Sequence, residues 1–157
     1  MSRKCLLVIR IRSGIDAKSE VKRTLKMLRV GRTNYATLVD DRPDYMGMLM
    51  TVKDRVTWGE VSAATIRELL EKRGETAYNK KIEQDSLKAL GYETFDQLAQ
   101  KLYSCESELP KMTGLKPFFR LHPPRKGFRG KTKLSFGASG EAGYRGERIN
   151  ELASRMI

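Results

Sequence analysis

The chain has 157 residues, of which 39% are hydrophobic, so it can bury the core of one domain without a metal or a disulfide. Its 31 Lys and Arg residues outnumber 19 Asp and Glu residues, and the formal net charge of +12 attracts polyanions. We therefore expect a nucleic acid as the partner, ahead of a membrane surface, although charge alone does not separate RNA from DNA.

The cysteines and the single histidine form no metal motif. Cys5 and Cys105 are far apart in sequence, and no Cys/His pair has the spacing of a zinc site, so we expect reduced thiols and no metal. The first apolar run, residues 5–9, is too short for a signal peptide, and no stretch approaches the roughly 20 residues of a membrane span. The sequence therefore predicts a cytoplasmic protein without a cofactor.

Charge divides the chain into three regions. Residues 1–59 hold 13 basic and 6 acidic side chains, residues 60–110 hold 7 and 10, and residues 111–157 hold 11 and 3. Two basic regions flank a mildly acidic one, so the contacts with a polyanion are expected from the two ends. Together with the elements below, this distribution predicts a folded core at 1–61, a helical extension at 62–110, and a basic arm with a terminal helix at 111–157.

The first region has the pattern of a β-α-β-α-β unit. Residues 4–12 alternate like a half-buried strand, with Leu7 and Ile9 on one face and Arg10 and Arg12 on the other. This pattern favours a sheet face that is open toward nucleic acid, and a merely solvated face is the alternative.

A helix is expected to follow this first strand. Asp16 is a suitable N-cap, Arg29 lies near the end, and Gly31 is a suitable stop. A second strand, a short helix starting near Pro43 and a third strand complete the unit. The two further strands are expected at 35–40 and 55–61.

Capping and stop residues divide the second region into three helices. These helices are expected to begin at or just after Ser62, Asp85 and Thr94. Gly74 and Gly91 are expected to end the first two. The region therefore has the pattern of a small helical subdomain.

The third region changes character after Pro110. Residues 111–140 contain no acidic side chain, while Lys, Arg, Gly, Pro and four phenylalanines are frequent. Such a segment has too few periodic apolar residues for a core of its own, so we expect an extended basic arm over 116–133. The apolar spacing at 149–156 predicts an amphipathic helix that docks on the folded body.

Basic side chains of the arm and of the first region are the candidates for contact with nucleic acid. Arginine forks and lysine ammonium groups bind phosphates, and the phenylalanines either stack on bases or anchor the arm. The alternatives are a solvated tail and solvated helix faces. The candidate residues are Arg10, Arg12, Lys22, Lys26, Arg29, Arg32, Lys53, Arg120, His122, Arg125, Lys126, Arg129, Lys131, Lys133 and Arg145.

No residue pattern supports catalysis. Gly130-Lys131-Thr132 resembles the end of a phosphate-binding loop, but Arg125 stands where that loop needs a glycine. His122 has no Ser, Cys or carboxylate partner nearby in sequence. We therefore expect a binding protein and not an enzyme.

Several segments together resemble a known family. They include Tyr45-Met46-Gly47-Met48 and Gly143-Tyr144-Arg145-Gly146, and the full set covers residues 6–12, 24–29, 34–41, 45–48, 56–60, 119–125, 143–146 and 149–152. In this order they resemble large-subunit ribosomal protein thirty, the L-thirty family, called L-seven in eukaryotes. The chain is similar to the long, archaeal-type form. One departure is at 137–140, where relatives tend to have paired glycines.

The resemblance implies an α+β fold: a β-α-β-α-β ferredoxin-like core with a three-stranded antiparallel sheet, then a helical extension and an extended basic arm. It also implies a structural constituent of the large ribosomal subunit. Such a protein binds ribosomal RNA, near the 5S RNA and beside other large-subunit proteins, without a cofactor or a small-molecule substrate. The alternatives are a ribosome-assembly factor or a general RNA-binding protein of the same family, and a DNA-binding protein.

Overall fold

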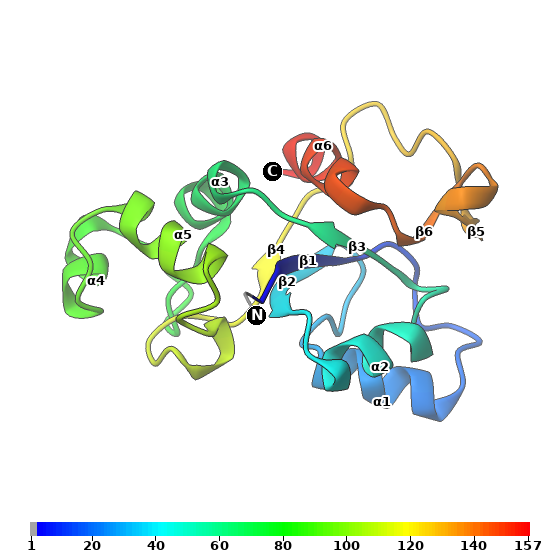
Figure 1. Cartoon of the computed structure of the whole chain (residues 1–157), viewed down its shortest axis with the longest axis horizontal. Helices are drawn as coiled ribbons and strands as arrows, with labels where there is room; N and C mark the ends of the chain where they lie inside the picture. The colour runs from blue at the N-terminus through cyan, green and yellow to red at the C-terminus, as the bar shows by residue number, and fades with distance from the viewer. Residues whose placement is uncertain (1–2) are drawn as a thin grey trace.

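One mixed β-sheet runs through residues 3–157, which the computed structural model describes, and helices cover both of its faces (Figure 1). Its order is fourth, second, first, third, sixth and fifth strand. The expected α+β class is confirmed, but the three-stranded sheet is wrong, because six strands lie in the described residues. The strands are β1 (Cys5–Arg10), β2 (Tyr35–Asp40), β3 (Val56–Glu60), β4 (Phe119–Arg120), β5 (Lys131–Ser135) and β6 (Gly140–Tyr144).

β1 lies between β2 and β3 and is antiparallel to both. All six of its side chains are buried, because alternate residues enter two hydrophobic cores on opposite faces of the sheet. Leu7 and Ile9 enter the core beneath the later helices, while Leu6 and Val8 enter the other. The expected open face of this strand is therefore wrong. That face is covered by α1 (Ser19–Met27) and α2 (Pro43–Thr51) (Figure 1).

The expected start of α1 is wrong, while its end lies close to the expected one. Asp16 is not the N-cap, since it has a left-handed backbone with φ of 64° and the helix begins three residues later, after Lys18. At the other end Arg29, with φ of 63°, takes the left-handed position expected of Gly31. The following backbone N–H groups donate to the last carbonyls of the helix, as in a Schellman motif.

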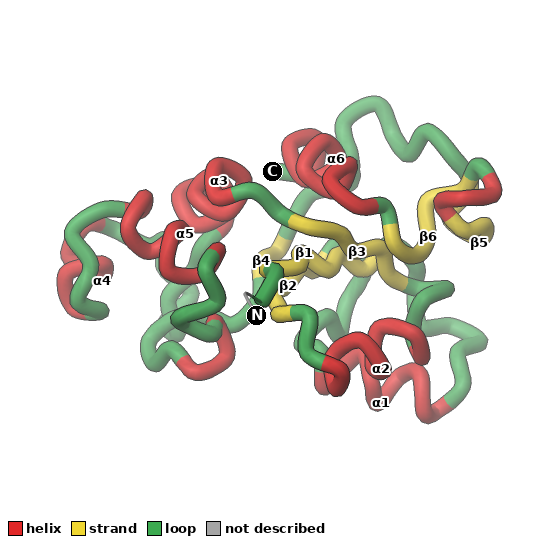
Figure 2. Tube along the Cα trace, viewed as in Figure 1, coloured by secondary structure: helices red, strands yellow, loops and turns green. Residues whose placement is uncertain are grey.

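The helical extension lies beside one end of the sheet (Figure 2). The predicted caps at Ser62 and Thr94 are confirmed, because each hydroxyl accepts a hydrogen bond from the backbone N–H three residues later. Asp85 lies in the first turn of its helix, whose N-cap is Glu83. The helices are α3 (Ala63–Arg73), α4 (Gln84–Ala89) and α5 (Phe95–Tyr103).

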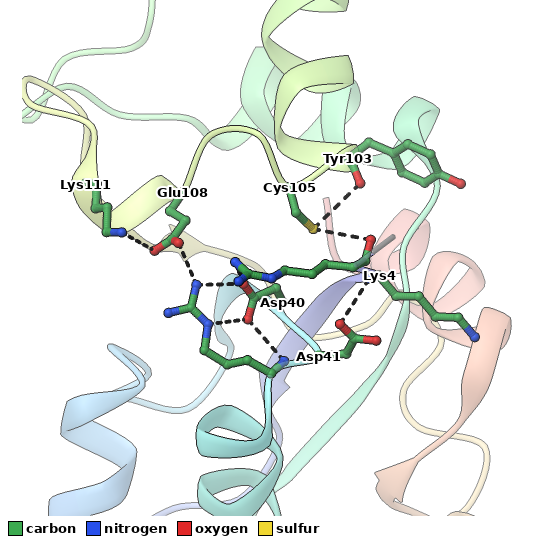
Figure 3. Close-up of polar contacts among 9 residues, drawn as sticks. Lys4, Asp40, Asp41, Tyr103, Cys105, Glu108 and Lys111 are labelled. Atoms are coloured by element: carbon green, nitrogen blue, oxygen red, sulfur yellow. Dashed lines mark hydrogen bonds and ion pairs between the residues drawn. The ribbon is translucent and has the colours of Figure 1, made fainter. Parts of the chain in front are cut away.

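Charged side chains tie this extension to the end of β2 (Figure 3). Asp40 accepts hydrogen bonds from Nε and Nη2 of Arg42 at 2.8 and 2.7 Å, and Nη2 also donates to Glu108 at 2.5 Å. Lys111 pairs with the other oxygen of Glu108 at 3.3 Å. Burial acts to raise the pKa of Asp40, but the hydrogen bonds and charge of Arg42 outweigh it and hold that pKa below its usual range.

The last part of the chain joins both edges of the β1–β3 sheet. β4 pairs antiparallel with β2 at one edge, and β6 pairs parallel with β3 at the other, with β5 beside it. The predicted terminal helix is confirmed as α6 (Ile149–Met156), whose apolar side chains are buried. We call residues 119–157 the clasp. The expected extended basic arm over 116–133 is not seen, because β4 and the start of β5 belong to the sheet.

Candidate nucleic-acid interface

Basic side chains from three separate segments meet in a groove beside the end of α2. The groove has a volume of about 590 Å³ and is also lined by the acids Asp16, Glu20 and Asp54. Its basic side chains come from the loop after β1, from the loop before β3 and from β5, so the fold brings cations of the core and of the clasp together. We call this the basic groove, with its cations Arg12, Lys18, Arg55 and Lys133.

The α1 face and its flanking loops carry a second group of cations. Lys22 and Lys26 are exposed on successive turns of α1 and line a shallow cavity of about 420 Å³. The exposed residues Arg29, Arg32 and Lys53 lie outside both cavities. These five candidates are therefore accessible, but the fold does not gather them into one site.

Arg10 is a candidate that the fold removes from solvent. It is 6% exposed, and its guanidinium donates to the carbonyl oxygens of Arg12 at 2.9 Å and Val30 at 3.1 Å. Burial, and then repulsion by Arg55, lowers the pKa of Arg10. Its expected exposure to nucleic acid is wrong, because this side chain holds loop backbone in place.

Arg145 is the second buried candidate. It is 8% exposed, and its Nη2 donates to Glu141 at 2.5 Å. Its Nε donates to the hydroxyl of Thr57 on β3 at 2.7 Å. The ion pair fixes β6 and the turn after it against the core strand, so this side chain stabilises the clasp and is not offered to solvent.

Arg120 is exposed but already has a carboxylate partner. Two of its nitrogens donate to Glu75, with Nη2 at 2.5 Å from one oxygen and 2.6 Å from the other. Lys116 also donates to Glu75, at 3.1 Å. Burial acts to raise the pKa of Glu75, but these hydrogen bonds lower it, so the carboxylate stays charged and neutralises part of this region.

The remaining candidates of the clasp are exposed and lie on its loops and on β5. They are His122, Arg125, Lys126, Arg129, Lys131 and Lys133. Arg129 forms an exposed ion pair with Glu151 at 2.8 Å, which is weak in water and can exchange for a phosphate. The clasp therefore presents a row of accessible cations, as the composition predicted.

Three of the four phenylalanines in this region pack against the rest of the protein. Phe119 is buried in the main core, and Phe128 packs against the same core. Phe118 stacks on Tyr35, with ring centroids 5.0 Å apart. Phe136 lies beside two guanidinium groups in a cavity described below. Phe118, Phe119 and Phe128 therefore anchor the chain and are not available to stack on bases.

Several cations of these surfaces are absent from the sequence-based candidates. Lys18 and Arg55 line the basic groove, and Arg148 and Arg155 line a cavity beside α6. Arg148 is the N-cap of α6 and Arg155 lies in its last turn, and their seven-residue spacing, about two helical turns, could have revealed them. The groove could not be read from sequence, because its segments are more than 30 residues apart.

The structure offers no ligand set for a metal within residues 3–157, and no helix in that range has the length and apolar content needed to span a bilayer. Cys5 is buried, and burial raises the pKa of its thiol far above its usual value. This favours the neutral, unreactive thiol.

Comparisons with known proteins give the family. The model of the family "Ribosomal protein L30p/L7e" matches residues 6–56. "Large ribosomal subunit protein uL30" of Thermofilum pendens is 43% identical over 96% of this chain and 97% of that protein. The protein of the same name from Ignicoccus hospitalis is 44% identical over 100% of both chains, and that of Methanopyrus kandleri is 41% identical over 94% and 100%. This chain therefore belongs to the ribosomal protein L30p/L7e family.

Proposed function

We propose that this chain is a structural constituent of the large ribosomal subunit, that it binds ribosomal RNA there and that it catalyses no reaction. The observation that carries this proposal is the identity of 41–44% with uL30 proteins of three archaea over at least 94% of the chain. A net charge of +12 supports RNA as the ligand. The proposed place of action is the ribosome in the cytoplasm.

Two of the three proposed regions contact RNA. The core, residues 1–61, contributes the α1 lysines and most of the basic groove, while residues 111–157 contribute the exposed clasp cations. The helical extension, residues 62–110, carries more acidic than basic side chains and is proposed to face neighbouring ribosomal proteins. The residues proposed to bind RNA are the candidates predicted from the sequence. Two of them, Arg10 and Arg145, contribute indirectly, by stabilising the loops and strands that they contact.

The mode of recognition proposed is neutralisation of phosphates with little reading of bases. Arginine and lysine side chains on a rigid body suit the shape and phosphate pattern of folded RNA. If about eight phosphates are neutralised, the logarithm of the binding constant should fall against the logarithm of salt with a slope of roughly −5 to −7. We also propose that the chain lies near the 5S RNA in the large subunit.

Fractionation of cell extract on sucrose gradients tests the function. We expect the chain to migrate with mature large subunits at moderate salt and to leave them only at high salt. Its presence in precursor particles alone would instead support a ribosome-assembly factor. Binding of duplex DNA as strongly as RNA would support the third alternative, a DNA-binding protein.

Charge reversal tests which surface binds. Arg125→Glu with Arg129→Glu should lower incorporation into large subunits more than any single change of a lysine in the core, because two exposed cations of the clasp become anions. Lys80→Glu with Lys81→Glu is the matched control, since it makes the same charge change in the helical extension. Equal losses from the two pairs would contradict the assignment of RNA contact to the clasp.

A further inference from the structure

A cavity of about 400 Å³ opens between the loop before β5, the turn joining β5 to β6, and α6. Its volume lies within the roughly 300–1,000 Å³ of small-ligand sites. Four arginines, two glutamates and one aromatic ring line it, so its net charge is positive. We call it the Phe136 pocket, with the charged residues Arg129, Glu141, Arg145, Arg148, Glu151 and Arg155.

The floor of the Phe136 pocket is rigid. Glu141 and Arg145 are buried, pair with each other at 2.5 Å, and are further fixed by the N–H of Gly130, which donates to Glu141 at 2.9 Å. The turn above the floor is tight, because a Cβ at Gly140 would lie 2.0 Å from the carbonyl oxygen of Leu134. The cavity is therefore formed before any ligand arrives, which limits the entropy lost on binding.

The wall of the pocket has an aromatic ring with two cations beside it. Phe136 is half-buried, and the guanidinium carbons of Arg145 and Arg148 lie 5.0 and 5.6 Å from its ring centroid. Arg145 is fixed by Glu141, whereas Arg148 is exposed and forms no ion pair within residues 3–157. Arg148 can therefore leave the ring and contact a phosphate while a flat group replaces it on Phe136.

We propose that the Phe136 pocket binds one unstacked ribonucleotide, with its base on Phe136 and its phosphate on Arg148. This inference rests on the proposed function, since the nucleotide would belong to the bound RNA. Aromatic rings are the common platform for unpaired bases, and arginine forks bind the adjoining phosphates. Carboxylate oxygens of the exposed Glu151 can accept from an exocyclic amine of the base.

The test compares two fluorescein-labelled RNA hairpins that differ only by one bulged nucleotide, with binding to the full chain followed by anisotropy at fixed salt. The wild type should bind the bulged hairpin about five- to tenfold more tightly, within the usual range for stacking one base on an aromatic ring. Phe136→Ala should reduce this preference to about one, and Phe136→Trp should keep it. Tyr103→Ala, which removes a partly exposed ring of α5, is the control and should keep it.

Arg148→Gln provides a second variant that cannot unfold the chain by creating a cavity, because Arg148 is exposed. It should weaken binding of the bulged hairpin and reduce the salt slope by roughly 0.7, as expected for one lost phosphate contact. A wild type that binds both hairpins equally, or a preference that survives Phe136→Ala, would overturn the pocket and leave the proposed function intact. Failure of the wild type to bind either RNA would count against both.

Discussion

The strands of the core and the strands of the clasp lie in one sheet but form for different reasons. β1–β3 have five or six residues each and are almost fully buried, so contacts between their own side chains stabilise their pairing. In the clasp, β4 has two residues and β5 is almost fully exposed. β4 forms on the unpaired edge of β2 and β5 forms on the edge of β6, so the structure of both strands depends on tertiary contact.

The core and the clasp also differ in what holds their positively charged side chains in place. In the core, Lys22 and Lys26 stand on α1, where their exposure follows from helical spacing, and other cations lie in short loops between the buried strands and the two helices. In the clasp, Arg125, Lys126 and Arg129 lie in the loop before β5, and the buried Arg145–Glu141 pair holds the end of that loop through the N–H of Gly130. Loss of one contact should therefore affect the clasp more than the core.

The largest expected effect comes from breaking that pair. Arg145→Leu leaves Glu141 buried without its cation and should lower the free energy of unfolding by about 3–5 kcal/mol in urea denaturation. Hydrogen exchange should accelerate in β5 and β6 first, while β1 keeps its protection. The double change with Glu141→Leu should recover a large part of the loss. Equal acceleration in β1 would show that clasp and core unfold as one unit.

A smaller effect is expected where the clasp crosses the core. A Cβ at Gly59 on β3 would lie 1.9 Å from the carbonyl oxygen of Gly146, so Gly59→Ala should lower the free energy of unfolding by about 2–3 kcal/mol. Gly47→Ala is the control, because a Cβ in this position on α2 meets nothing within 4 Å. It should stabilise the protein by roughly 0.5–1 kcal/mol. A neutral Gly59→Ala in thermal and urea unfolding would contradict this close approach.

The smallest effect concerns the junction of the core with the helical extension, outside the clasp. Asp40→Asn removes the carboxylate that Arg42 binds and should cost about 1 kcal/mol at neutral pH, since Arg42 is partly exposed. The folded pKa of Asp40 is lowered, so its contribution is present above the unfolded value of about 3.9 and is lost as pH falls through the folded value. Urea titrations between about pH 6 and pH 2 should show a smaller fall in stability for the variant. An identical fall for both proteins would exclude Asp40 as a source of acid sensitivity.

The sequence was sufficient for elements whose residues carry their own pattern. β2 begins and ends as expected, the caps of α3 and α5 at Ser62 and Thr94 were correct, and α6 was located by its apolar spacing. Hydrophobic period and cap chemistry act over a few residues, so they can be read locally. The end of α1 was expected near Arg29, but Gly31 was expected in the left-handed stop position that Arg29 takes, because arginine rarely adopts the conformation that glycine favours.

The interface was harder to predict than the fold. Accessible cations such as Arg125 and Lys126 follow from composition, because a loop without apolar neighbours stays exposed. The burial of Arg10 was missed because alternation along β1 gives the face of a side chain but not whether helices cover that face. The basic groove combines Arg12 with Lys133, and contacts over such a separation depend on the complete sheet.

The pairing of the clasp with both edges of the core sheet also affects the chain while it is being synthesised. During translation the outer edges of β2 and β3 remain unpaired until residues 119–144 have left the exit tunnel. Unpaired strand edges are templates for association with other chains, so the nascent core is exposed to aggregation during that interval. Rapid emergence of β4 and β6 therefore protects the newly made chain as much as it completes the finished one.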